Sequence, residues 1–386
     1  MRYGTIRAGC LAAALCLGAM PAPAWAGTPE FAYTAEQWAS LRDDRLEFAE
    51  IAGLIHVYNN TVIQNQLEYE DFRGEDADDI ADDYYDAADD IYGNLEYPDS
   101  SDTDYASRLS SYLNSQIQAD NLREQGDDNV EDGDVKKLEY DKTEAGLVKQ
   151  AQELMISYWS QTYSLESLEQ NKIQAQSAYD QTLTRLSAGM STQAQVLSAQ
   201  EAVTSADASL LSAQSSLGQT KENLCLMLGW TYGAQVDIGE VPEPDLEAME
   251  AINLDEDVSR GVENNYSLKI LKKKIANAKS GTNRSSLEQS LKSQKETAAS
   301  SIKNAYESMM ISQSDYQQAL DTYEIEAAAM ETAERKMAAG TMTRNGYVAQ
   351  QTSFASARVN VRTQKLALLK AQLEYQWSVD GLASVS

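Results

Sequence analysis

The sequence is poor in the side chains from which disulfides, metal centres and nucleophilic sites are built. It has one histidine and three cysteines in 386 residues. Cys10 and Cys16 lie in a short amino-terminal segment that we expect to be removed, and the remaining thiol, Cys225, has no intramolecular partner for a disulfide. His56 has no serine or cysteine in a nucleophile context to serve. Phosphate loops, dinucleotide fingerprints and metal-ligand spacings are missing too, so the sequence predicts no catalysis and no cofactor.

Basic side chains are also scarce. Lysine and arginine number 31 against 60 aspartates and glutamates, which gives a formal net charge of −29. Nucleic-acid binding requires a basic footprint, because the protein must neutralise phosphates. The charge balance therefore excludes a nucleic-acid partner.

Long hydrophobic runs are missing except near the start of the chain. Arg2 and Arg7 precede an apolar run over residues 8–20. The small residues Ala24 and Ala26 flank Trp25 just before Gly27. This pattern is typical of a cleaved secretory signal peptide, here over residues 1–26, and the run is too short for a permanent membrane span. We therefore predict an exported mature chain that begins at residue 27.

What the sequence does contain is a long internal repeat. Gly189 and Gly340 lie 151 residues apart, and each stands between two heptad runs. The apolar heptad positions after Gly189 are Val196, Val203, Leu210, Leu217 and Leu224, and the same offset leads to Tyr347, Phe354, Val361, Leu368 and Tyr375. A shared offset on both sides of each glycine predicts two copies of one coiled-coil hairpin.

The interleaved heptad positions are mostly small, for example Ala199, Ala206 and Ala213 in the first copy. Small residues let helix backbones approach closely on more than one side, which favours a curved wall of helices. An ordinary four-helix bundle is the alternative. Either way the fold class is all-α, with two tandem long helical hairpins in each protomer.

The repeat also sets the expected domain boundaries. We expect a first repeat over residues 27–230, a linker over 231–253 and a second repeat over 254–386. The helical patterns cover residues 35–66, 142–187, 192–228, 254–279, 286–338 and 343–379, with short turns between the last members of each copy.

An acidic insert, residues 68–134, interrupts the first repeat. It carries 23 acidic residues against three arginines. Helical spacing of Ile80, Tyr84 and Ile91, and again of Tyr105 and Leu109, predicts a short helical hairpin, followed by a flexible stretch over residues 125–134.

Calcium binding is an open alternative for the end of this insert. An EF-hand register would start at Asp128 and use Asp132, Gly133 and Glu139, but Val130 occupies a ligand position. A solvated, repulsive surface element is the other interpretation.

Three stretches resemble TolC-type outer membrane efflux proteins. Residues 185–200 and 226–229 are similar to the tip and return helix of that family, residues 339–343 to its second tip, and residues 254–268 to the opening of its repeat. The resemblance implies a homotrimer whose twelve helical strands close into an α-barrel duct in the cell envelope, associated with the outer membrane. It further implies that an adaptor (membrane fusion) protein and an inner-membrane pump dock at the turn end, and that export through the duct is passive.

The sequence departs from the family at two points. The family carries a membrane-crossing β-hairpin in each repeat, but the corresponding places here hold the acidic insert and residues 281–286, neither of which supplies strands of about ten residues. This argues against independent insertion into the membrane. The family's gate and latch positions fall on Gln195, Gly346, Ala349 and Met342, so no gating residue carries over.

The two turns are the candidate functional site. Glycine reaches a left-handed conformation without a Cβ penalty, so Gly189 and Gly340 suit helix ends. Ser191 and Thr192, and in the second copy Thr341 and Thr343, can cap the returning helices. The complete candidate set for adaptor docking is Gly189, Met190, Thr192, Gly340, Thr341, Met342 and Thr343. The methionines offer adaptable apolar contacts to a partner.

Two functions remain from different classes. The first is an exit duct of a multipartite efflux or type I-like secretion system. The second is an exported coiled-coil structural or adhesive envelope protein without a pore. A duct requires a hollow closed ring of protomers, whereas a spacer does not.

Overall fold

A computed structural model describes residues 34, 41, 43–101 and 103–386. The chain divides into two units, Met1–Arg42 and Asp43–Ser386, and the second contains all the elements described below. The predicted signal peptide and the predicted start of a helix at residue 35 lie outside the described residues. Cys225 is buried, and burial raises the pKa of its thiol, as expected for an inert core cysteine.

Helices account for nearly all of the described structure. The first repeat contains a 3-10 turn (Phe48–Glu50), α2 (Ile51–Tyr58), α3 (Asn60–Phe72), α4 (Ala77–Gly93), α5 (Tyr105–Asp127), α6 (Gly133–Ser187) and α7 (Gln193–Met227). The linker contains α8 (Leu246–Glu250), and the second repeat contains α9 (Leu254–Asn264), α10 (Tyr266–Asn277), α11 (Gly281–Ala338), α12 (Arg344–Trp377) and a π-helical turn (Ser378–Leu382). The only strands in this part of the chain, β1 (Arg45–Leu46) and β2 (Asp237–Ile238), pair in parallel.

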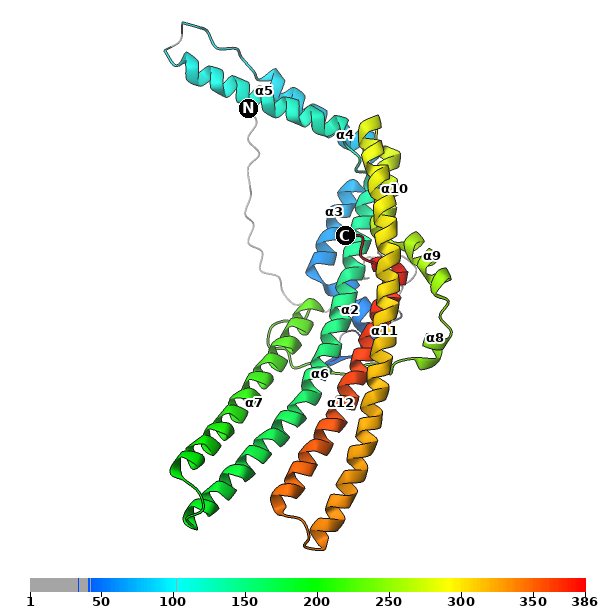
Figure 1. The fold of residues 1–386 in the computed structure, drawn as a ribbon. Coiled ribbons are helices and arrows are strands. Elements are labelled where there is room, and N and C mark those ends of the chain that lie inside the picture. The colour runs from blue at the N-terminus through cyan, green and yellow to red at the C-terminus, as the bar shows by residue number, and fades with distance from the viewer. Residues whose placement is uncertain (1–33, 35–40, 42, 102) are drawn as a thin grey trace, which may run out of the picture. The chain divides into compact units, whose positions relative to one another are not determined.

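Four long helices form one row in the order α7, α6, α12, α11 (Figure 1). Each hairpin is one half of the row, and α6 meets α12 at the centre. This central contact is antiparallel: Trp377 Nε1 donates to Gln152 Oε1 at 2.8 Å near one end, whereas Arg362 Nη1 lies 3.1 Å from Glu166 Oε2 further along. The all-α fold with two tandem hairpins is confirmed.

The apolar core lies at the end of the row that is remote from the turns. Leu268 of α10, Ile302 and Met309 of α11 and Leu368 of α12 are buried together there. Each contributes about 1.5–3 kcal/mol by leaving water. The core therefore fixes α9 and α10 against the second hairpin.

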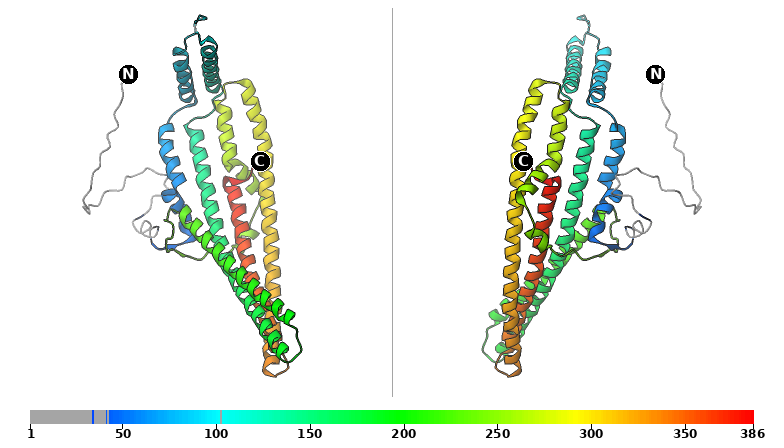
Figure 2. Two further views of the ribbon diagram at one scale, coloured as in Figure 1. Left: turned by 90° about the vertical axis from the view of Figure 1, so that its left-hand side faces the viewer. Right: turned by 90° about the vertical axis from the view of Figure 1, so that its right-hand side faces the viewer.

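The arm, which we define as α4 and α5, extends beyond this same end in every view (Figures 1 and 2). The expectation of a short helical hairpin in the acidic insert is confirmed. The expected flexible stretch over residues 125–134 is wrong: α5 continues to Asp127, and α6 already begins at Gly133 because Asp132 Oδ1 accepts the Val135 N–H at 2.6 Å.

The remaining differences from the expected elements concern where helices begin and break. In the described part of the helix expected over residues 35–66, β1 and a 3-10 turn precede α2, and the extended backbone of Asn59 separates α2 from α3. The helix predicted over residues 254–279 is two helices, α9 and α10, which meet at Asn265. The turn expected near residues 281–285 is also displaced, since Ser280 caps α11 and the helix begins at Gly281. No helix in the described part of the chain has the length and apolar character needed to cross a membrane.

Candidate docking turns and the base of the arm

The first turn ends α6 with a left-handed glycine. Gly189 has φ +72°, its N–H donates to Leu186 O at 2.9 Å, and the N–H of Met190 donates to Arg185 O at 2.8 Å. This pair of bonds is a Schellman motif, which satisfies carbonyls at the helix end. Thr192 then opens α7 with a capping box: its Oγ1 accepts from Gln195 N, and Gln195 Oε1 accepts from Thr192 N at 2.8 Å.

The second turn repeats this geometry 151 residues later. Gly340 has φ +70° and donates to Met337 O at 3.1 Å, while Thr341 N donates to Lys336 O at 2.9 Å. Thr343 caps α12 by accepting from Gly346 N at 3.2 Å. The glycines are confirmed as helix ends, and of the four predicted caps Thr192 and Thr343 are confirmed. Ser191 and Thr341 form other hydrogen bonds: Ser191 Oγ donates to Gln195 Oε1, and Thr341 Oγ1 donates to Lys336 O.

Both turns lie at the same end of the row (Figure 1). A link that the sequence did not reveal connects the hairpins close to this end: Asn345 Nδ2 of α12 donates to Gln181 Oε1 of α6. Met190 is 70% exposed, whereas Met342 is half-buried. The turns therefore form one surface with one prominent apolar side chain, and Met342 is less available than the sequence suggests.

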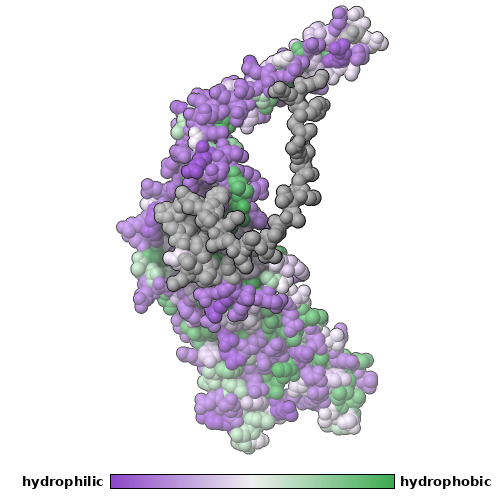
Figure 3. Space-filling view, turned by 180° about the vertical axis from the view of Figure 1, so that it is seen from behind, coloured by the Kyte–Doolittle hydropathy of each residue, from purple (hydrophilic) through white to green (hydrophobic). Residues whose placement is uncertain are grey.

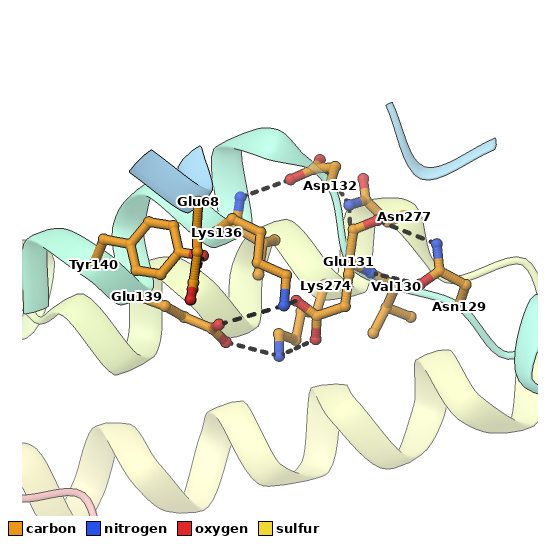
Figure 4. Close-up of polar contacts among 11 residues, drawn as sticks. Glu68, Asn129, Val130, Glu131, Asp132, Lys136, Glu139, Tyr140, Lys274 and Asn277 are labelled. Carbon is orange, nitrogen blue, oxygen red and sulfur yellow. Dashed lines mark hydrogen bonds and ion pairs between the residues drawn. The ribbon is translucent and has the colours of Figure 1, made fainter. Parts of the chain in front are cut away.

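The base of the arm is a second organised polar site (Figure 4). Lys274 of α10 lies 2.6 Å from Glu131 Oε1 and 3.2 Å from Glu139 Oε1. Burial alone would lower the pKa of the Lys274 ammonium, but the hydrogen bond and charge of Glu131, together with those of Glu139, raise it. Asn277 adds two bonds, to Val130 O at 3.0 Å and to Asp132 Oδ2 at 2.7 Å.

Further ion pairs connect the same region to the basic side of α10. Lys273 Nζ lies 2.5 Å from Asp134 Oδ2, and Lys279 Nζ lies 2.7 Å from Asp78 Oδ1 at the start of α4. The sequence feature that could have predicted these ion pairs is the lysine-rich stretch 269–279, whose positive charge complements the acidic insert.

The calcium register proposed for residues 128–139 is not formed. Gly133 opens helix α6 instead of turning a loop, Asp132 caps that helix, and Glu139 pairs with Lys274. In the described ranges, no group of three or more acidic, histidine or cysteine side chains is placed to hold a metal ion.

A pair of asparagines extends the internal repeat beyond the long hairpins. Asn59 separates α2 from α3 and donates to Met227 O at 2.8 Å; Asn265 separates α9 from α10 and donates to Ala383 O at 2.8 Å. Both asparagines are buried and cap the helix that follows them. In each copy the asparagine therefore joins the break between the first two helices to the backbone at the end of the return helix or a few residues beyond it. His56, close to the first of these breaks, lies 2.8 Å from Glu144 Oε1 and links α2 to α6, which agrees with a structural role.

Comparison with known proteins agrees with this geometry. Residues 106–230 match the family model described as outer membrane efflux protein. No curated protein matches the sequence. Three similar solved structures are a membrane protein from Pseudomonas aeruginosa (13% identity, 86% of this chain and 93% of that chain, TM-score 0.51), the outer membrane protein VceC from Vibrio cholerae (9%, 86% and 96%, 0.51) and CusC, whose description concerns transmembrane channel formation (11%, 90% and 100%, 0.53).

The paired hairpins with glycine turns therefore form an all-helical, TolC-like fold, similar to the fold of these solved structures. The sequence pattern of the outer membrane efflux protein family covers residues 106–230, which are most of the first repeat. At these identities the solved structures establish the fold alone.

Proposed function

We propose that the mature chain forms a homotrimeric exit duct in the cell envelope, for an efflux or type I-like secretion system. Substrate would leave passively through the helical tunnel after delivery by an inner-membrane pump and an adaptor protein docked on the turns. The single observation that carries the proposal is the row α7–α6–α12–α11, in which neither edge helix has another long helix on its outer side within the described chain; α9 and α10 pack against α11 around Ile302.

The two edges carry matching apolar stripes. Leu197 and Leu211 on α7 are both more than half exposed and lie two heptads apart, and the same holds for Ile311 and Ile325 on α11. From behind, apolar patches lie over the hairpins, while most of the visible surface of the arm is hydrophilic (Figure 3). Packing α7 of one copy against α11 of the next is a heterologous contact, which generates a ring when its rotation closes.

The Schellman turns support the assignment of the docking end. Both turns lie at the same end of the row, so that Gly189, Met190 and Thr192 of one and Gly340, Thr341, Met342 and Thr343 of the other could contact one partner, and a trimer would present six such turns as a crown.

Light scattering and negative-stain imaging of residues 27–386 test the duct. We expect a trimer mass at micromolar concentration and end-on views with a central hole. A monomer mass would contradict the proposed duct. Solid rods without a hole would support the alternative, an exported structural or adhesive envelope protein.

A further inference from the structure

The arm has a well-packed inner seam. Ala81 and Ala88 of α4 and Ala119 of α5 are fully buried in it, and a Cβ on Gly126 would lie 2.5 Å from the ring of Tyr85. Polar bonds hold the same seam, because Tyr85 OH donates to Asp127 Oδ1 at 2.9 Å and Arg123 lies 2.6 Å from Asp89. The two helices therefore pack against each other and pair their polar groups along this seam, and their other faces point outward.

Large apolar side chains nevertheless remain exposed in the distal half of the arm. Leu113 and Ile117, one helical turn apart on α5, are 47% and 56% exposed, and Tyr97 in the connecting loop is 65% exposed. Tyr97 packs edge-on against Tyr112, the neighbour of Leu113, with ring centroids 5.3 Å apart. We call Tyr97, Leu113 and Ile117 the distal patch. Exposed apolar groups rimmed by polar residues are typical of interaction sites.

The charge around the distal patch is strongly one-sided. Residues 77–127 carry fourteen carboxylates and two arginines, a formal charge of −12, and seven of the aspartates are on α4. Residues 105–119 of α5, which present Leu113 and Ile117, contain no acidic residue. The arm thus combines an apolar strip on one helix with a carboxylate-lined helix beside it.

The apolar strip and the carboxylates together indicate which kind of partner fits the arm. A second arm would meet the same negative charge and be repelled, and so would an anionic lipid surface. A helix with leucine-like residues at i and i+4 and lysine or arginine on its flanks matches both features. At the base, the ion pair of Lys279 with Asp78 and the hydrogen bond from Asn129 Nδ2 to Ala77 O at 2.8 Å hold the start of α4 in place, which lowers the entropy lost on binding.

We propose that the arm is a docking element for a basic amphipathic helix of a partner protein. The distal patch contacts the apolar face of that helix, and the aspartates of α4 pair with its lysines or arginines. This inference does not depend on trimer formation or on the docking turns, which lie at the opposite end of the row (Figure 2).

The test uses the mature protein and a fluorescent peptide of about 18 residues with leucines at helical spacing and lysines elsewhere, a length of about 27 Å. We expect saturable binding by anisotropy that weakens as salt rises from about 0.05 to 0.5 M, because screening shortens the reach of the charges. Leu113→Ser with Ile117→Ser should weaken binding at least tenfold. A peptide with serine in place of leucine should also bind at least tenfold more weakly.

A matched control is Leu67→Ser on α3 with Leu246→Ser on α8, which removes two similarly exposed leucines (58% and 43%) outside the arm and the edge stripes and should leave peptide binding unchanged. Asp82→Asn, Asp83→Asn and Asp86→Asn together should weaken binding at low salt and flatten its salt dependence. The proposal is overturned if the arm variant binds like the wild type, if the control variant loses as much affinity, or if the protein instead sediments with phosphatidylglycerol vesicles. Circular dichroism of each variant confirms that the helices persist.

Discussion

Two glycines with the same left-handed backbone differ in their surroundings. A Cβ on Gly189, at φ +72°, would meet nothing within 4 Å, whereas a Cβ on Gly229, at φ +86°, would lie 2.4 Å from Tyr58 Cβ. We predict that Gly189→Ala costs only the conformational penalty of about 1–2 kcal/mol. Gly229→Ala should add a packing cost of about 1–3 kcal/mol.

Chemical unfolding of the two variants measures this difference. Equal losses would contradict the close approach of Gly229 to α2. Gly218→Ala, at a helical position on α7 with open space around it, provides the comparison and should stabilise by about 0.5–1 kcal/mol.

At the residue scale, the sequence revealed what depends on local chemistry. Each turn offers two hydroxyl residues as caps, and the sequence does not decide between them; Thr192 and Thr343 cap because their side chains accept from the N–H three residues later. Asn59 and Asn265 were not recognised as equivalent, because they lie 206 residues apart and the repeat offset is 151. The difference of 55 residues is the insertion in the first copy, which hides this part of the repeat from a search at one fixed offset.

At the element scale, the hairpin helices ended close to where the heptads ended, since glycine and threonine stop and start them locally. The start of α6 was missed by nine residues. Residues 125–134 look like a loop because they are acidic and contain Gly126 and Gly133, but α10 supplies the lysines and Asn277 that order them. Local sequence patterns cannot reveal contacts with residues more than 130 positions away in the chain.

Lys274 gives a prediction for this junction. Lys274→Met leaves Glu131 and Glu139 with Lys136 alone, whose Nζ lies at the longer distances of 3.8 and 4.0 Å, and the Lys274 side chain is only 20% exposed. Breaking a fully buried pair costs about 3–5 kcal/mol, and partial solvation should reduce this to about 1–2 kcal/mol at pH 8. Amide hydrogen exchange of residues 128–139 measures the loss, and Lys137→Met, whose exposed pair with Asp141 is screened by water, should change it by less than about 0.5 kcal/mol.

The pH dependence has a definite sign. The folded state raises the pKa of Lys274, so its contribution is fully present below the ordinary lysine value of about 10.4 and is lost as pH rises through the higher folded value. The difference between the wild type and Lys274→Met should therefore be constant from about pH 7 to 9 and shrink above about pH 10.4. A difference that disappears already at neutral pH would contradict the ion-pair assignment.

At the scale of the whole molecule, ring closure makes the edge stripes the decisive surface. We predict that Leu211→Glu with Ile325→Glu converts the trimer into monomers, because each interface would bury two uncompensated carboxylates. Light scattering at micromolar concentration measures the mass. The matched control is Ile117→Glu on the arm, which is exposed away from both edges and should leave the trimer intact; a trimer that survives the edge variant would place the interface elsewhere.

The turns provide the test of docking. Met190→Glu with Met342→Glu places six carboxylates on the crown of a trimer without touching the buried core, so stability should change by less than about 0.5 kcal/mol. Because Met190 is far more exposed than Met342, Met190→Glu alone should account for most of the effect. If the crown binds an adaptor through apolar contacts, the double variant should lose adaptor capture and export while light scattering still reports a trimer. Adaptor capture at the wild-type level would remove the docking role from the turns and leave the duct to be entered by another route.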